Sequence, residues 1–143
     1  MNLLLVRHGL VNQTGELNRD GKNFAKKLIQ LIPNPNNIDY ICSDEEQRCI
    51  ETISPLASDI RLEKHTFTKG DFANSTPLKN SLQHNYAIIC YRIESINTIL
   101  QEIGLPQFNN NNRDEAYEFI YNLQIVKNRL KSTNKIPTGY KKI

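Results

Sequence analysis

The chain has 143 residues, of which 38% are hydrophobic and 23% charged, and its formal net charge at pH 7 is +3. This length and composition predict a single domain, residues 1–143, with one core. The small net charge argues against a general electrostatic field for nucleic acid, and no apolar run approaches the length of a membrane span. We therefore expect a soluble cytoplasmic protein that binds neither nucleic acid nor membranes.

The cysteine count agrees with that compartment. Cys42, Cys49 and Cys90 cannot all pair within one chain, and two of the three lie in or beside apolar segments. We expect reduced, buried thiols, which fit a reducing environment.

A short apolar run, Leu3–Val6, predicts a strand buried on both faces, and Arg7, His8 and Gly9 follow it directly. In open α/β sheets, sites form just beyond the carboxyl ends of central strands. An imidazole nitrogen placed there can attack phosphorus, and a neighbouring guanidinium can bind phosphate oxygens. The alternative is a strand end that simply faces water. A second matching element further along the chain favours the phosphoryl-transfer interpretation.

The next predicted element is an amphipathic helix that begins after Asn18 and ends before Pro33. The Asn18 side chain can accept a hydrogen bond from an amide of the first turn, and proline cannot continue a helix. Apolar side chains recur in this segment at three- and four-residue steps, so one helix face can cover a sheet.

Residues 38–42 predict a second strand, and a helix follows from near Glu45. We expect this helix to kink or end at Pro55. Arg48 lies one turn into the helix and is therefore expected at the same edge of the sheet as His8. The competing interpretation of Arg48 is an ion pair within its own helix.

The middle of the chain predicts a short strand over 60–67 and a loop with a short helix over 68–84. A clear buried strand follows at 86–90, with Tyr91 and Arg92 at its tip. If the strand continues, these two side chains point to opposite faces. A helix is then expected from about residue 94 to a stop at Gly104, and residues 109–112 form a surface loop.

Apolar residues alternate with period two over 117–125, which predicts a strand, although a helix competes because residues 115–130 contain few breakers. The tail, residues 131–143, is rich in lysine and is expected to be a solvated surface. Binding of nucleic acid or another anionic surface is the alternative for this tail.

Taken in order, these segments resemble the histidine phosphatase superfamily, also called phosphoglycerate mutase-like. Leu3–Gly9 is similar to the opening strand and Arg-His-Gly signature of that family, and Leu17–Gly21 is similar to its entry into the first helix. A third stretch resembles the family's Ser-Arg-Thr element and contains Ser43, Arg48 and Thr52. A set of motifs in the same order is more specific than any single one.

This resemblance implies a three-layer α/β/α sandwich with a mainly parallel sheet. It also implies that His8 is the nucleophile that becomes phosphorylated, and that Arg7 and Arg48 bind the phosphoryl oxygens. No metal and no organic cofactor are implied. The substrate or partner would be a phosphorylated small molecule or a phosphoprotein.

The sequence departs from the family in three places. Ser43 and Arg48 are five positions apart, where the family usually has four. The family's second histidine follows a strand that resembles Ala87–Cys90, and Tyr91 occupies this position. Tyr91 is expected to bind the phosphoryl group, but it can donate only one hydrogen bond and carries no positive charge at neutral pH.

The third departure is that no acidic residue clearly matches the family's proton donor. We expect Asp71 to take this role, with Glu63 and Glu94 as alternatives. For each of them, the competing interpretation is a carboxylate on a surface loop.

Two functions therefore stay open at this stage. The first is a weak or specialised phosphohydrolase that acts through a phospho-His8 intermediate. The second is a catalytically degenerate relative whose pocket binds phosphate or a phosphorylated ligand without turnover. A third, more distant alternative is a partner-binding domain that uses its basic tail.

Overall fold

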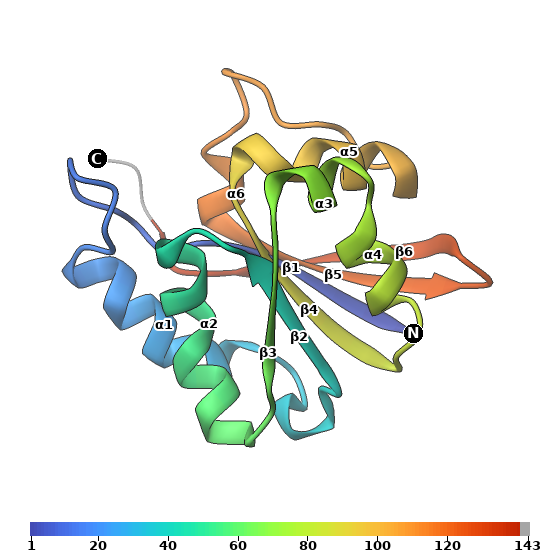
Figure 1. Cartoon of the computed structure of the whole chain (residues 1–143), viewed down its shortest axis with the longest axis horizontal. Helices are drawn as coiled ribbons and strands as arrows, with labels where there is room; N and C mark the ends of the chain where they lie inside the picture. Colours follow the sequence, from blue (N-terminus) through green and yellow to red (C-terminus); the bar gives the residue numbers. More distant parts are fainter. Residues whose placement is uncertain (141–143) are drawn as a thin grey trace.

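The structure is a computed structural model that describes residues 1–140, and it contains one six-stranded sheet with helices on both faces (Figure 1). The strands are β1 (Asn2–Arg7), β2 (Tyr40–Asp44), β3 (Lys64–Phe67), β4 (Tyr86–Tyr91), β5 (Phe119–Val126) and β6 (Arg129–Pro137). Their order in the sheet is β3-β2-β4-β1-β5-β6. The first four in this order pair in parallel, whereas β5 and β6 are antiparallel. The predicted three-layer fold with a mainly parallel sheet is confirmed.

Two apolar clusters attach the helices to the two faces of the sheet. On one face lie α1 (Arg19–Leu31) and α2 (Gln47–Ile60); on the other lie α3 (Lys69–Ala73), α4 (Thr76–Ser81) and α5 (Ile93–Ile103). A 3-10 turn at Pro35–Asn37 follows α1, and the short helix α6 (Glu115–Glu118) leads into β5. None of the described helices combines the length and the apolar character needed to cross a membrane.

The central strand β1 is buried on both faces, as its unbroken apolar sequence predicts. Leu3 and Leu5 pack in the cluster that contains α5, whereas Leu4 and Val6 pack against α1 and α2. Burial of four apolar side chains fixes this strand rigidly. The polar residues at its carboxyl end are therefore held on stable support.

Helix ends follow local chemistry where the sequence contains a clear signal. The Asn18 side chain accepts a hydrogen bond of 2.8 Å from the Gly21 amide at the start of α1. Gly104 ends α5 with φ of 85°, a left-handed conformation that glycine adopts without steric strain. The caps predicted at these two positions are confirmed.

The second helix differs from the prediction at both ends. It begins at Gln47 instead of near Glu45, because the Asp44 carboxylate accepts a hydrogen bond of 3.0 Å from the Glu46 amide and forms a turn first. It also continues past Pro55 to Ile60. Burial of the side chains on both sides of this proline offsets the loss of one backbone hydrogen bond.

The strands near the two edges of the sheet also differ from the prediction. Residue 60 still belongs to α2, so β3 occupies only the second half of the segment 60–67. The predicted strand 117–125 is confirmed from Phe119 onward, because 115–118 form α6. Residues 131–137, expected as a solvated basic surface, are largely exposed but belong to the edge strand β6. Lys141 and Lys142 lie outside the described residues.

Candidate active site

Arg7 and His8 lie at the carboxyl end of β1, where they are 7% and 4% exposed. Directly behind them, the Gly9 amide donates a hydrogen bond of 2.9 Å to the Thr52 hydroxyl. That hydroxyl donates in turn to the Arg48 carbonyl at 2.7 Å. The opening motif and the element with Arg48 and Thr52, which are far apart in the sequence, are thus joined at one point.

Two glycines allow the first helix to approach this point. A Cβ atom on Gly9 would lie 2.8 Å from the Gly21 backbone, and one on Gly21 would lie 2.2 Å from the Leu10 carbonyl. Since backbone atoms cannot yield as a flexible side chain can, neither position accepts a larger residue without a shift of the chain. The first turn of α1 is therefore packed against the loop that carries His8.

The imidazole of His8 has a defined tautomer. Its Nδ1 lies 2.7 Å from the Gly9 carbonyl, which can only accept, so Nδ1 carries the proton and Nε2 keeps a free lone pair. Burial and, to a smaller extent, the positive charges of Arg7 and Arg48 lower the pKa of His8 to about 4. The hydrogen bond to Gly9 acts in the opposite direction but does not offset them. His8 is therefore neutral and nucleophilic at pH 7.

Arg7 is a buried cation without an acidic partner among residues 1–140. Its guanidinium carbon lies 3.7 Å from the centre of the Tyr117 ring, and Nη1 donates a hydrogen bond of 3.0 Å to the Arg113 carbonyl. Its Nε is buried and has no hydrogen-bond partner. Burial lowers the pKa of Arg7 because water no longer stabilises the charge. An anion beside Arg7 would supply the missing acceptor.

Arg48 resembles Arg7 in its hydrogen bonding. Its Nε is also buried without a partner, and its charge acts on His8 and on Glu94. A Cβ atom on Gly15 would lie 3.3 Å from Arg48 Nη1, so the loop after β1 passes over the guanidinium. In the part of the chain that the structure describes, no ion pair joins Arg7 or Arg48 to a carboxylate.

Tyr91, which the resemblance places where the family has its second histidine, is a core residue. Tyr91 is 1% exposed, stacks on Phe108 with ring centres 6.3 Å apart and pairs with Arg7 across the two strands. Burial raises the pKa of Tyr91 well above its usual value, so the hydroxyl stays neutral. Its carbonyl accepts a hydrogen bond of 3.2 Å from the His8 amide. The role of this hydroxyl in phosphate binding stays a prediction.

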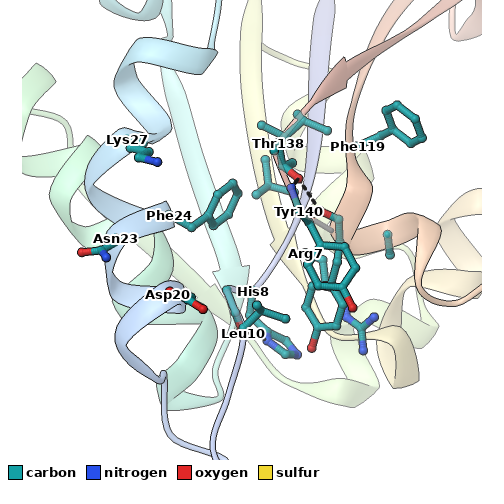
Figure 2. A pocket seen from close by; sticks show the side chains of 16 residues that line it. Arg7, His8, Leu10, Asp20, Asn23, Phe24, Lys27, Phe119, Thr138 and Tyr140 are labelled. Carbon is teal, nitrogen blue, oxygen red and sulfur yellow. Dashed lines mark hydrogen bonds between the residues drawn. The ribbon is translucent and has the colours of Figure 1, made fainter. Parts of the chain in front are cut away.

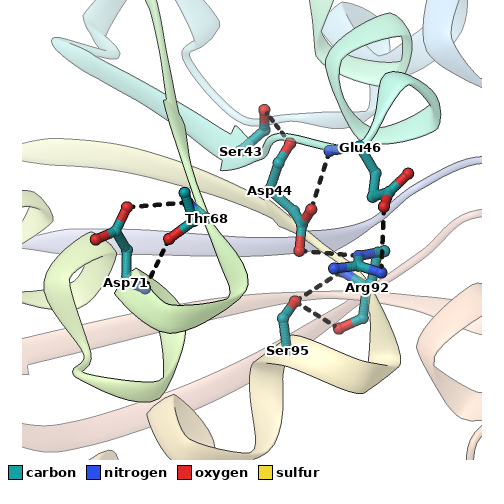
Figure 3. A network of polar contacts seen from close by, with 7 residues as sticks. All are labelled: Ser43, Asp44, Glu46, Thr68, Asp71, Arg92 and Ser95. Carbon is teal, nitrogen blue, oxygen red and sulfur yellow. Dashed lines mark hydrogen bonds and ion pairs between the residues drawn. The ribbon is translucent and has the colours of Figure 1, made fainter.

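Arg92 contacts two carboxylates, those of Asp44 and Glu46 (Figure 3). Its Nε donates a 2.9 Å hydrogen bond to the completely buried carboxylate of Asp44, and Nη1 lies 3.6 Å from Glu46. This pair joins the carboxyl ends of β2 and β4. The charge of Arg92 is already balanced within the protein.

The predicted proton donor Asp71 takes part in a helix cap (Figure 3). Its carboxylate accepts a hydrogen bond of 2.9 Å from the Thr68 amide, and its own amide donates to the Thr68 hydroxyl at 3.1 Å. The two alternatives, Glu63 and Glu94, are both exposed, and Glu94 lies in the first turn of α5 near several cations. Burial raises the pKa of Glu94, but its own backbone amide and the charges of Arg92, Arg48 and Arg113 lower it overall.

A cavity of about 320 Å³ opens beside the nucleophile (Figure 2). His8 and Arg7 line one end of it, and α1 forms one wall. The opposite wall consists of Tyr117 and the segment 138–140. The sequence-predicted residues Arg7 and His8 therefore line this cavity, whereas Arg48, Tyr91 and Asp71 do not.

Several residues near the site were not anticipated from the sequence. These are Asp20 on the rim of the cavity, Arg113 beside Arg7, and the two aromatic residues of the far wall, Tyr117 and Tyr140. Asp20 lies inside a recognised motif, so its position next to Gly21 was an available signal. The others come from the last third of the chain, where no motif marks them. Within residues 1–140, no cluster of three or more His, Cys, Asp or Glu side chains could hold a metal ion.

The fold described above has counterparts among solved structures. No known protein family matches the sequence as a whole, and no curated protein does so. The fold is that of the histidine phosphatase superfamily, the phosphoglycerate mutase-like fold, which confirms the fold expected from the resemblance.

Three solved structures illustrate this likeness. The α-ribazole phosphatase from Shigella flexneri superposes with a TM-score of 0.69 at 14% identity, over 96% of both chains. A mycobacterial glucosyl-3-phosphoglycerate phosphatase bound to inorganic phosphate has a TM-score of 0.68 at 13% identity, over 93% of this chain and 95% of the other. The protein histidine phosphatase SixA with tungstate has a TM-score of 0.62 at 12% identity, over 96% and 97%.

Proposed function

We propose that this protein is a phosphohydrolase that forms a covalent phospho-His8 intermediate and turns over slowly. The observation that carries the proposal is the pair of buried Nε atoms, one on Arg7 and one on Arg48, that lack an acceptor within residues 1–140 and lie near a neutral imidazole. The substrate class is a phosphorylated small molecule or a phosphoprotein. The named structural neighbours include phosphatases of both kinds, which supports this range.

The reaction takes two steps. The lone pair on His8 Nε2 attacks phosphorus, the bond between phosphorus and the leaving oxygen breaks, and that oxygen takes a proton. Water then attacks the phosphorus, the phosphorus–nitrogen bond breaks, and inorganic phosphate leaves with the imidazole neutral again. Arg7 and Arg48 hold the phosphoryl oxygens throughout and stabilise the negative charge of both transition states.

The leaving oxygen needs a proton, and three carboxyl groups compete for this task. Asp71 and, as an alternative, Glu94 near Arg48 are proposed from the sequence, and the geometry adds Asp20, which lines the cavity. Asp20→Asn, Glu94→Gln and Asp71→Asn separate these proposals. The variant that lacks the proton donor should phosphorylate His8 about 10²–10⁴-fold more slowly, while the other two variants should keep the wild-type rate.

Slow turnover is expected because the second histidine is missing. The other two histidines, His65 and His84, stack on opposite sides of Tyr40, with ring centres 4.9 and 4.4 Å from it. Removal of one preorganised donor to the developing charge costs about 10²–10³ in rate. Neither the buried hydroxyl of Tyr91 nor the paired Arg92 replaces it as a free cation.

The same observation favours a second candidate function, a pocket that binds a phosphorylated ligand without turnover. In that case the guanidinium groups bind the phosphoryl oxygens, and His8 supplies shape and a hydrogen-bond acceptor. The two functions differ in one product, because only the first forms a bond between His8 and phosphorus.

The deciding experiment is a rapid quench in base with radioactive phosphate monoesters. The first function predicts label on the protein that is stable in base, labile in acid and absent from His8→Gln. His84→Gln is the matched control and should still be labelled. Isothermal calorimetry with inorganic phosphate and vanadate completes the test, since binding without label supports the second function and absence of both contradicts the whole proposal.

A further inference from the structure

The cavity beside His8 extends well beyond the space that a phosphoryl group needs. Its volume of about 320 Å³ lies at the lower end of the range for small-molecule sites, about 300–1,000 Å³. Arg7 and His8 line one end, so a ligand whose phosphoryl group meets them has its remaining part in the cavity. The residues of the other walls therefore decide which leaving group fits.

Aromatic side chains form two of those walls. Phe24 projects from α1 into the cavity toward the side on which Tyr140 lies (Figure 2). Tyr140 packs against Tyr117, with ring centres 5.4 Å apart and planes inclined by 47°. One face of Tyr117 is occupied by Arg7, and Phe24 and Tyr140 are two further rings that line the cavity.

The wall that carries Tyr140 is anchored by hydrogen bonds. The Thr138 amide donates to the Glu118 carbonyl at 2.9 Å, and the Thr138 hydroxyl bonds to the Tyr117 carbonyl. The Tyr140 amide in turn donates to the Thr138 hydroxyl at 3.2 Å. The second aromatic wall is thus held in place before any ligand arrives, which lowers the entropic cost of binding.

We propose that the cavity selects phosphate monoesters whose leaving group is a flat aromatic ring, which enters between Phe24 and Tyr140 while the phosphoryl group meets Arg7 and His8. This specificity rests on the function proposed above. Asn23 and Lys27 lie on the same helix as Phe24 and also line the cavity, so ring substituents that accept hydrogen bonds find donors there.

The test compares ligands that differ only in aromaticity. Phenylphosphonate and cyclohexylphosphonate are not hydrolysed and have rings of similar size, and calorimetry on the full chain gives a dissociation constant for each. We expect phenylphosphonate to bind about three- to tenfold more tightly than cyclohexylphosphonate, as stacking against aromatic faces predicts. If turnover is measurable, benzyl phosphate should exceed cyclohexylmethyl phosphate in kcat/KM by a similar factor.

Variants assign the preference to the two walls. Phe24→Leu and Tyr140→Leu should each reduce the ratio between the two phosphonates toward one, with little change in the affinity for inorganic phosphate. Phe67→Leu is the matched control, because Phe67 is a half-buried aromatic residue in the core on the other face of the sheet, and it should leave the ratio unchanged.

The two proposals fail separately. If inorganic phosphate binds but both phosphonates bind equally well in the wild type, the aromatic specificity is wrong and the phosphate site stands. If neither phosphate nor any phosphonate binds, the proposed function itself is wrong. A preference that survives both leucine variants would also overturn this assignment of the cavity walls.

Discussion

Arg92 and Arg7 lie at the carboxyl ends of two neighbouring parallel strands, but only Arg92 is paired with carboxylates among the described residues. Arg92, at the end of β4, makes a 2.9 Å bond to the buried carboxylate of Asp44 and a longer contact to Glu46. Arg7 follows the adjacent strand β1, and its nearest described partners are a carbonyl and an aromatic ring. Arg48 resembles Arg7 in having a buried Nε without an acceptor.

This difference separates a structural cation from cations that are ready for a ligand. A buried charge normally has a partner, because desolvation without compensation is costly. Arg92 satisfies this rule within the protein. In the proposed function, Arg7 and Arg48 acquire a compensating partner only when an anion binds. The desolvation cost of these two cations is already present in the unliganded protein, so it does not oppose binding.

The largest expected effect concerns the paired arginine. Arg92→Met leaves the carboxylate of Asp44 buried without its cation, so the free energy of unfolding should fall by about 3–5 kcal/mol. Urea denaturation measures this loss, and Asp44→Asn combined with Arg92→Met should recover most of it. A loss below about 1 kcal/mol for the single variant would remove the structural role of this pair.

The next prediction concerns protons on His8. Its pKa is about 4 in the folded protein and about 6.5 in the unfolded chain, so the unfolded state binds more protons between these values. The stabilisation is present above pH 6.5 and is lost as the pH falls toward 4, by about 3 kcal/mol in total. Urea denaturation from pH 7.5 to 4.5 should show this slope, and His8→Gln should flatten it while His84→Gln does not.

A smaller effect is expected for the unpaired arginines. Arg7→Met and Arg48→Met each remove a charge-assisted hydrogen bond to the anion, so the dissociation constant for vanadate should rise about 10- to 100-fold. The free energy of unfolding should stay constant or increase, because each substitution removes a poorly compensated buried charge. Arg129→Met on the exposed strand β6 serves as the control. If Arg7→Met or Arg48→Met lowered the free energy of unfolding as much as Arg92→Met, these arginines would be structural residues like Arg92.

The smallest effect concerns the helix cap that contains Asp71. Thr68→Ala removes one hydrogen bond of the cap, so the free energy of unfolding should decrease by about 1 kcal/mol. Phosphorylation of His8 should not change in this variant. If it slows together with Asp71→Asn, the cap positions a catalytic carboxyl group, and Asp71 is more than a structural residue.

The sequence predicted the centre of the fold better than its periphery. β1 and β4 are apolar without interruption and buried on both faces, so local composition and final environment agree. β6 consists largely of Lys, Ser, Thr and Asn, and it becomes a strand only because β5 offers a free edge to pair with. Pro55 was read as a helix breaker, but the packing of its neighbours outweighs the lost hydrogen bond.

The same division applies to the candidate site. Arg7, His8 and Arg48 belong to motifs with fixed spacing, so their meeting at one edge followed from the order of strands and helices. Tyr117, Tyr140 and Arg113 come from segments whose position depends on how the last hairpin folds back. No local pattern could place them, because long-range pairing alone brings them to β1.

In the proposed phospho-His8 intermediate, the hydrogen bond between Nδ1 of His8 and the Gly9 carbonyl determines which ring nitrogen carries phosphorus. With Nδ1 occupied by its proton, phosphorus can attach only to the distal nitrogen, which gives the tele isomer of phosphohistidine. Phosphorus NMR distinguishes this isomer from the pros form. Detection of the pros form would mean that the ring rotates by half a turn before it reacts.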